Sequence, residues 1–300
     1  DDRTSRGLGD VYKRQINLQV VDDFIFDENQ TSTITGSVSS SSDASFTGAA
    51  DKSVDVITED NEVVDIIVNV LDNLTSESGD TGSFEINLTT EPLSDVFIEL
   101  TSTNELEGVL STSVISFNAT NWNIPQVVIV TGVDDDPPVS DGAADYIIIT
   151  GNVSSTDDNY GLLDGSTVDD VNMSNQDNDS PGIILTVLND DFSTSESGDY
   201  VVVQFSLLSK PDGGESVTIP LSLDGPANEM DLSADSITIL ADNWDNTTSN
   251  VVTITGIDEL FADGNLELIL ITGDPTSASP FYDAIGADDV SNPTLTNEDD

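Results

Sequence analysis

Acidic residues recur at corresponding places along this chain, and carboxylates in recurring loops are ligands for a hard cation. The hexapeptide Thr-Ser-Glu-Ser-Gly-Asp occurs at 75–80 and again at 194–199, so that Glu77 in the first copy corresponds to Glu196 in the second. Ca²⁺ takes six to eight oxygen ligands in irregular geometry, whereas Mg²⁺ demands stricter geometry and keeps several waters. The first hypothesis is therefore a calcium site that is copied together with a module.

Three further acidic positions recur after each hexapeptide. They are an acid pair after a Thr-Gly dipeptide, a single acid five to seven residues beyond the first acid of that pair, and an acidic run at the end of the module. The candidate metal ligands are Glu77, Asp134, Asp135, Asp141, Asp177 and Asp179 in one copy, Glu196, Asp258, Glu259, Asp263, Asp299 and Asp300 in the next, and Asp22, Asp23, Asp27 and Asp60 in a partial copy. The alternative is a solvated acidic surface, as in a salt-adapted organism. Dispersed surface charge has no reason to reappear at the same loop positions, so the spacing favours a site.

Short apolar runs lie between these acids and must position them. Phe84, Ile86 and Leu88 alternate with polar residues, the period-two pattern of a half-buried strand. No stretch shows sustained helical periodicity with caps. Similar runs occupy Ser83–Leu88, Val96–Leu100, Val114–Phe117, Val127–Val130 and Tyr146–Ile149, then Val201–Leu207, Val217–Leu223, Ile237–Leu240, Val251–Ile254 and Leu266–Ile271. About seven such strands in a module predict an all-β fold of tandem antiparallel, Ig-like β-sandwiches, in which loops at one end can converge.

The repeats predict the division of the chain. The dipeptides Asn121-Trp122 and Asn243-Trp244 keep their place in both full copies, and the tryptophans are expected to be core or corner aromatics rather than ligand platforms. The first 15 residues hold four of the six basic residues and resemble translated adaptor or vector sequence. We expect a fragment of a longer tandem array, divided into a non-native leader (1–15), the C-terminal part of a truncated repeat (16–62) and two complete repeats (63–179 and 180–300).

Composition narrows the partners. The chain has 58 acidic and 6 basic residues and a formal net charge of −52, so nucleic acid and anionic lipid are poor partners and cations are good ones. The absence of His and Cys removes the commonest general base, the usual zinc ligands and any disulfide framework. No apolar run approaches the roughly 18 residues that would cross a membrane.

The sequence resembles a tandem array of Calx-beta domains of the kind found in bacterial surface and adhesin-type proteins. The resemblance lies in Ser76-Glu77-Ser78-Gly79, in the strand 127–130 that leads into Asp134-Asp135-Asp136, and in the closing Asp177-Asn178-Asp179. It implies a calcium cluster at one end of each sandwich, with the acids above as ligands. Where the family has a longer Asp-Tyr segment, this chain has Asn104-Glu105-Leu106-Glu107 and Asn228-Glu229-Met230-Asp231.

The leading functional hypothesis is a calcium-binding repeat region, rigidified by calcium, in the stalk or adhesive part of a large secreted or cell-surface protein. Its partners would be calcium ions, neighbouring repeats of the same chain and a cell-surface or carbohydrate ligand. One alternative is an accessory carbohydrate-binding module of a secreted multidomain hydrolase, and another is a calcium-sensing region beside a transporter. We expect no catalysis within these residues, because a catalytic carboxylate pair is not normally copied into every module.

Overall fold

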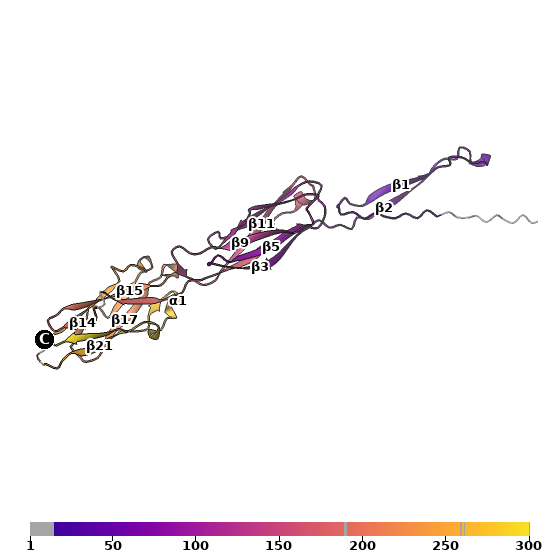
Figure 1. Cartoon of the computed structure of the whole chain (residues 1–300). Coiled ribbons are helices and arrows are strands. Elements are labelled where there is room, and N and C mark those ends of the chain that lie inside the picture. Colours follow the sequence, from indigo (N-terminus) through magenta and orange to yellow (C-terminus); the bar gives the residue numbers. More distant parts are fainter. Residues whose placement is uncertain (1–14, 189–190, 259, 261, 300) are drawn as a thin grey trace, which may run out of the picture.

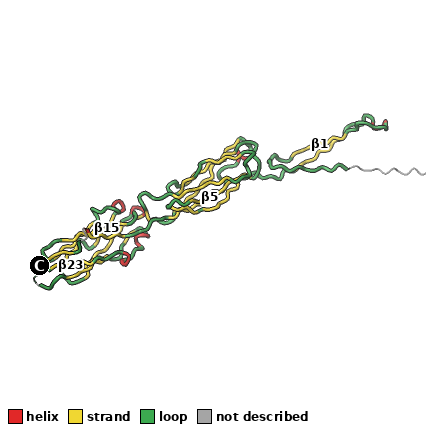
Figure 2. The backbone as a smooth tube through the Cα atoms, in the orientation of Figure 1, coloured by secondary structure: helices red, strands yellow, loops and turns green. Residues whose placement is uncertain are grey.

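The chain folds into β-structures that follow one another along a line (Figure 1). The computed structural model describes residues 15–188, 191–258, 260 and 262–299. A two-stranded hairpin comes first and two β-sandwiches follow (Figures 1 and 2). Strands dominate the described residues and helices are short, so the predicted all-β class of tandem antiparallel sandwiches is confirmed. Most of the predicted leader, residues 1–14, lies outside the described residues.

The first sandwich, which we call module A (63–179), consists of two sheets. Their strand orders are β3-β5-β9-β7 and β4-β12-β11-β6-β8. All of these pairs are antiparallel except the short parallel pair of β12 and β4. The elements are β3 (Ile66–Asp72), β4 (Leu74–Ser76), β5 (Thr81–Leu88), β6 (Val96–Ser102), β7 (Gly108–Leu110), β8 (Val114–Phe117), β9 (Gln126–Gly132), β10 (Val139–Ser140), β11 (Ala144–Ser155), η2 (Tyr160–Leu162) and β12 (Val171–Gln176).

The second sandwich, module B (180–300), repeats this topology. Its sheets have the orders β13-β15-β20-β18 and β14-β23-β21-β17-β19, which match those of module A strand for strand. The elements are β13 (Ile183–Val187), β14 (Ser193–Ser195), β15 (Tyr200–Leu207), β16 (Lys210–Pro211), η4 (Asp212–Gly214), β17 (Val217–Asp224), β18 (Met230–Leu232), β19 (Ser236–Ile239), η5 (Ala241–Asn243), β20 (Val251–Gly256), β21 (Leu266–Thr272), β22 (Thr276–Ser277), α1 (Pro280–Asp283), η6 (Ala287–Asp289) and β23 (Thr294–Glu298). Each sandwich thus has more strands than the seven expected, because short strands flank the apolar runs.

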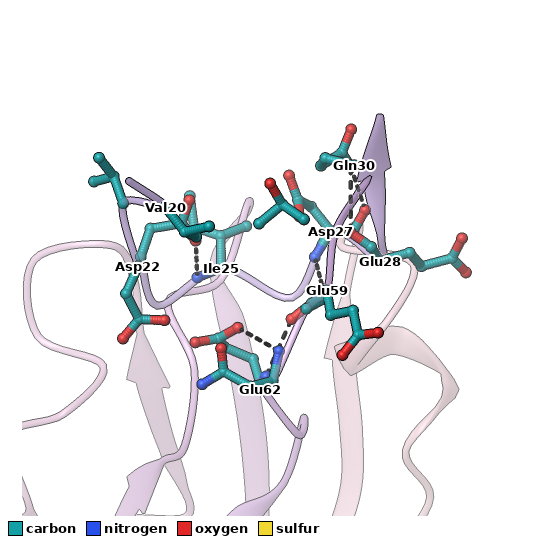
Figure 3. A pocket seen from close by; sticks show the side chains of 13 residues that line it. Val20, Asp22, Ile25, Asp27, Glu28, Gln30, Glu59 and Glu62 are labelled. Atoms are coloured by element: carbon teal, nitrogen blue, oxygen red, sulfur yellow. Dashed lines mark hydrogen bonds between the residues drawn. The ribbon is translucent and has the colours of Figure 1, made fainter. Parts of the chain in front are cut away.

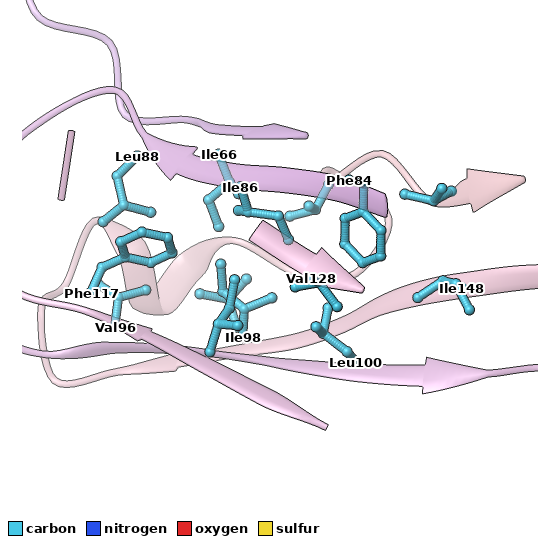
Figure 4. Packing of buried hydrophobic residues seen from close by; sticks show 14 of the residues in the cluster. Ile66, Phe84, Ile86, Leu88, Val96, Ile98, Leu100, Phe117, Val128 and Ile148 are labelled. Atoms are coloured by element: carbon cyan, nitrogen blue, oxygen red, sulfur yellow. The ribbon is translucent and has the colours of Figure 1, made fainter. Parts of the chain in front are cut away.

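Each module has its own hydrophobic core between its two sheets. In module A the inward side chains Phe84, Ile86 and Leu88 of β5 pack opposite Ile98 and Leu100 of β6, and none exposes more than 2% of its surface (Figure 4). Burial alternates along β5, as the period-two pattern predicts. Full burial of such a side chain contributes about 1.5–3 kcal/mol. The two core clusters share no residue, and the domain boundaries themselves stay predictions.

The tryptophans belong to these cores. Trp122 is 8% exposed within the core cluster of module A, and Trp244 packs, partly buried, against that of module B. The ring of Phe24, from the preceding hairpin segment, lies 5.7 Å from that of Trp122. The interpretation of these residues as core or corner aromatics is therefore confirmed.

The N-terminal segment has no core of its own. Strands β1 (Gln30–Gly36) and β2 (Lys52–Thr58) pair antiparallel, with the short turn η1 (Ala44–Phe46) between them. No described residue up to position 62 is buried. By their position after the recurring acids, β1 and β2 correspond to the first half of β11 and to β12.

Candidate metal centre

Five of the predicted acids of module A come together at the end of the sandwich that faces module B. Ligand oxygens of Glu77, Asp177 and Asp179 lie within 4.8 Å of one another, and so do those of Glu77, Asp135 and Asp141. Oxygens bound to one Ca²⁺ at 2.3–2.6 Å lie up to about 5 Å apart, so both groups have the spacing of a shared ion. Glu77 belongs to both groups, so an ion in either one takes Glu77 as a ligand.

A change of sheet brings Glu77 to this end. The chain leaves one sheet after β3, and β4 joins the other sheet by parallel pairing with β12. The Glu77 amide then donates to the Gln176 carbonyl at 3.0 Å, which places the Glu77 side chain beside the acids that follow β12. The side chain is 6% exposed, and its Oε2 accepts from the Asn178 amide at 3.0 Å.

Glycine at the end of β9 lets the backbone of β4, which precedes Glu77, pack closely against β9. A Cβ on Gly132 would lie 2.1 Å from the Ser76 carbonyl oxygen, and one on Gly256 would lie 2.2 Å from that of Ser195. Such contacts are impossible for a larger residue without backbone movement. The Thr-Gly dipeptide before each acid pair is therefore needed to pack β4 or β14 against the strand that carries the pair.

The carboxylate of Asp177 is a backbone anchor within the cluster. Its Oδ2 accepts from the amides of Asp141 at 3.0 Å and Gly142 at 2.7 Å, and its Oδ1 accepts from the Asp179 amide at 2.6 Å. Gly142 has the left-handed φ of 81° that directs its amide to the same oxygen. Asp177 thus holds the loop with Asp141 against the segment with Asp179.

The same anchor recurs in the other two copies. Asp60 accepts from the amide of Asp27 at 2.8 Å, and Asp299 accepts from that of Gly264 at 2.7 Å. The residue after the third acid is left-handed here as well, with φ 61° at Glu28 and 82° at Gly264. A left-handed backbone position that returns in every copy, twice at glycine and once at a non-glycine residue where it costs strain, indicates a geometry that the loops require.

Burial and, after it, repulsion by neighbouring carboxylates raise the pKa values of four acids in this cluster. Burial, assisted by the charges of Asp177, Asp135 and Asp179, raises the pKa of Glu77 to about 7. Burial and neighbouring acids likewise raise the pKa of Asp141 to about 6 and increase those of Asp135 and Asp179. Within the described part of the chain, no lysine forms an ion pair with this cluster.

Asp134 lies at the margin of the cluster. It is exposed and accepts from the Asn178 side chain at 3.4 Å, and its charge contributes to the raised pKa values of Asp135 and Asp179. The structure does not place it in either group of three ligand atoms. Asp134 therefore acts on the cluster through its negative charge and does not place a ligand oxygen within either group.

Glu107 is a member of the cluster that the sequence interpretation left aside. Its charge raises the pKa of Asp135 and Asp141, and its Oε2 accepts from the Asn175 side chain at 3.1 Å. In module B, Glu229 accepts from Asn297 at 3.4 Å in the same way. The signal was in the repeat, because these pairs are separated along the chain by the same interval as the two tryptophans.

Module B has the same backbone arrangement around Glu196, but its other described acids do not converge as those of module A do. Glu196 is 5% exposed and its amide donates to the Glu298 carbonyl at 3.2 Å, as Glu77 does to residue 176. Asp258 and Asp263 are exposed and Asp299 is half-buried. Glu259 and Asp300 lie outside the described residues. Among the residues that the structure does describe, the groups of three converging carboxylates both belong to module A.

The acids of the N-terminal segment line a pocket of their own (Figure 3). Asp22, Asp23, Asp27 and Asp60 all contribute to its wall, with Asp60 anchoring the Asp27 amide. Asp23 accepts from the Ile25 amide at 2.9 Å, a local turn contact. The structure does not bring three of these carboxylates within ligand distance of one another.

Comparison with known proteins yields remote structural likenesses. The sequence matches no protein-family model and no curated protein. The chain is similar to the calcium binding domain CBD12 of CALX1.1, with 12% identity, 77% of this chain and 99% of that chain covered, and a TM-score of 0.28. It is also similar to domains 4–9 of the surface layer protein SbsC (14% identity, 84% of this chain and 34% of that chain, TM-score 0.25).

A third likeness is to an endo-fucoidan hydrolase of glycoside hydrolase family 107, with 11% identity, 91% of this chain and 34% of that chain covered, and a TM-score of 0.25. All three likenesses are too remote to carry function.

Proposed function

We propose that the chain is a calcium-binding repeat region in which ions at the module ends stabilise the loops and stiffen the array. The observation that carries this proposal is the convergence of Glu77, Asp135, Asp141, Asp177 and Asp179 within ligand distance at the end of module A. Glu77 is almost fully buried among like charges, which is costly unless a cation balances them.

The donor set fits calcium. All five side chains offer hard oxygen donors, and the cluster contains no nitrogen or sulfur ligand, because the chain has no His or Cys. The Asp179 Oδ2 atom is buried, exposing less than 1 Å², and has no hydrogen-bond partner. A buried carboxylate oxygen without a donor beside four other acids suits direct coordination of a cation.

The mechanism is electrostatic. Without an ion, the carboxylates repel one another and disfavour the compact arrangement of the loops that carry them. A bound calcium ion supplies the positive charge that converts the repulsion into attraction. The loops with Asp135 and Asp141 and the segment with Asp177 and Asp179 would then be held together, and the last of these segments leads directly into module B.

Junction contacts support the stiffening role. Module A and module B are joined by the parallel pair of β10 and β16, and the Lys210 amide donates to the Pro138 carbonyl at 2.8 Å. Pro138 lies in the loop between Asp135 and Asp141. An ion that fixes this loop therefore also fixes the strand edge on which the next module docks.

A calcium titration tests the proposal. Isothermal titration calorimetry of the chelator-treated chain is expected to detect binding, with dissociation constants of about 10⁻⁴–10⁻³ M, the range of extracellular calcium modules. The melting temperature should rise with calcium and rise much less with the same concentration of magnesium. A melting temperature that calcium and chelator leave unchanged would refute the proposal.

The cellular setting is a second part of the proposal. Millimolar calcium affinity suits a secreted or cell-surface protein, which is also where stalks and adhesive regions of repeated sandwiches work. No helix of the described residues is long and apolar enough to cross a membrane. Trp122 is buried and therefore does not offer the exposed ring that a carbohydrate-binding module would use, and we place no catalytic step in these residues.

A further inference from the structure

A residue of module B lies beside the carboxylate cluster of module A. The parallel register pairs Val139 with Lys210 and Ser140 with Pro211. The residue that follows each strand is acidic, Asp141 after β10 and Asp212 after β16. The junction therefore brings Asp212 alongside an acid that already belongs to a group of three converging ligands.

One carboxylate oxygen of Asp212 is buried and has no hydrogen-bond donor. Its Oδ1 atom exposes less than 1 Å² and has no hydrogen-bond partner. Asp179 Oδ2, on the module A side, is buried and unpartnered in the same way. The charge of Asp212 is close enough to contribute to the raised pKa of Asp141. Asp212 belongs to neither group of three converging ligand atoms, but a cation bound between the two sides of the junction would satisfy both unpartnered oxygens.

Docking of the modules does not itself require this acid, as the preceding junction shows. There the Glu91 amide donates to the Phe24 carbonyl at 2.7 Å, the counterpart of the contact between Lys210 and Pro138. Leu93 stands two residues later, where Asp212 stands in module B, and it is 65% exposed. The same backbone contact thus forms with an apolar residue at this position.

The alignment of the two junctions rests on a buried tyrosine in each module. The Tyr160 hydroxyl accepts from the Thr90 amide at 3.1 Å, and the Tyr282 hydroxyl accepts from the Ser209 amide at 3.2 Å. Thr90 and Ser209 directly precede the docking residues Glu91 and Lys210. Leu93 and Asp212 therefore occupy the same place in their modules.

We propose that Asp212 is a ligand, contributed by module B, of the calcium ion that the carboxylates of module A hold. This inference rests on the proposed function and adds to it a direct bond between the ion and the next module. Calcium binding at this junction then depends on docking, and docking depends on calcium. The junction between the N-terminal segment and module A, with Leu93, lacks this bond and is less sensitive to calcium.

The test compares single-charge variants of the full chain. Asp212→Asn removes the negative charge and keeps the shape, Asp212→Leu copies the residue of the preceding junction, and Glu215→Gln removes an exposed charge three residues away. Calcium affinity is measured by isothermal titration calorimetry. The binding step that is lost in Glu77→Gln identifies the site of module A.

We expect Asp212→Asn and Asp212→Leu to weaken this step at least about tenfold, the scale of losses around metal sites. Glu215→Gln should stay within about twofold of the unsubstituted chain. In chelator, both Asp212 variants should melt at the same temperature as the unsubstituted chain or higher, because a repelling charge is gone. That control shows that they fold.

A second readout follows the junction itself. The chain has no cysteine, so Thr101→Cys in module A and Ser236→Cys in module B provide specific sites for spin labels. Calcium should narrow the distribution of distances between the labels in the parent and in Glu215→Gln, and should narrow it much less in Asp212→Asn.

The outcomes separate the two proposals. If a step is lost in Glu77→Gln but Asp212→Asn binds as tightly as the parent, Asp212 is not a ligand and the calcium function stands. Equal weakening by Asp212→Asn and Glu215→Gln would reduce the effect to general electrostatics and overturn the inference. If no binding step depends on Glu77, the proposed function fails and this inference fails with it.

Discussion

Replacement of Glu77 by glutamine should have opposite effects on stability with and without calcium. Glu77 is 6% exposed and is the one side chain common to both groups of converging carboxylates. Glutamine keeps the shape and removes the charge. In chelator, Glu77→Gln should therefore melt at a higher temperature than the parent at pH 8, where the parent side chain is ionised among four other acids.

The magnitude with calcium follows from linkage. A site with a dissociation constant of about 10⁻⁴–10⁻³ M is stabilised by about 1.4–2.7 kcal/mol in 10 mM calcium. For a module of this size that corresponds to a rise in melting temperature of about 5–12 °C. Loss of one carboxylate ligand should weaken binding at least about tenfold, which removes about 1.0–1.3 kcal/mol of the stabilisation.

The assay measures thermal unfolding by calorimetry, once in chelator and once in 10 mM calcium. Glu99→Gln provides the matched control. It makes the same chemical change at an exposed position of β6 in the same module. The control should keep the full calcium shift. If Glu77→Gln also keeps the full calcium shift, or if it is less stable than the parent in chelator, Glu77 is not a calcium ligand held among repelling charges.

Three other predictions concern pH and packing. Because the folded pKa of Glu77 is raised to about 7 and that of Asp141 to about 6, the folded state binds more protons than the unfolded state between about pH 4.5 and 7. The melting temperature in chelator should therefore fall as the pH rises from about 4.5 to 8, while calcium affinity rises over the same interval. Gly132→Ala should cost at least about 1–3 kcal/mol in denaturant titrations and weaken calcium binding, because its methyl group would lie 2.1 Å from a carbonyl oxygen next to the site, whereas Gly36→Ala meets only an ordinary contact at 3.8 Å. Tyr160→Phe removes a buried hydroxyl that bonds a backbone amide, and should destabilise module A by about 1–3 kcal/mol without changing its calcium affinity. Equal stability of this variant and its parent, or pH-independent melting in chelator, would contradict these expectations.

Local pattern was sufficient to predict the strands and most of the cluster. Alternation along 83–88 reflects one buried face, and the structure buries that face as a core. The recurrence of Glu77, Asp141 and Asp177 predicted that loops far apart in sequence meet at one end. It could do so because each sandwich places alternate loops at the same end, whatever the details of the strands.

Contacts that depend on three-dimensional detail could not be predicted from the sequence pattern. Glu107 joins the cluster through the buried amide of Asn175, which the sequence does not link to it. Asp134 and Asp135 look alike in sequence, but only Asp135 turns inward. Asp212 lies beside the site across a junction whose register comes from the pairing of two two-residue strands, too short to leave a signal in the sequence.

Calcium binding at the end of module A is tested most directly by a crystal structure of the chain grown in 10 mM calcium, with anomalous scattering used to locate the ions. We expect an ion within 2.3–2.6 Å of oxygens from Glu77 and from at least two of the acids Asp135, Asp141, Asp177 and Asp179. Well-ordered carboxylates at this end of module A with no calcium among them would contradict it.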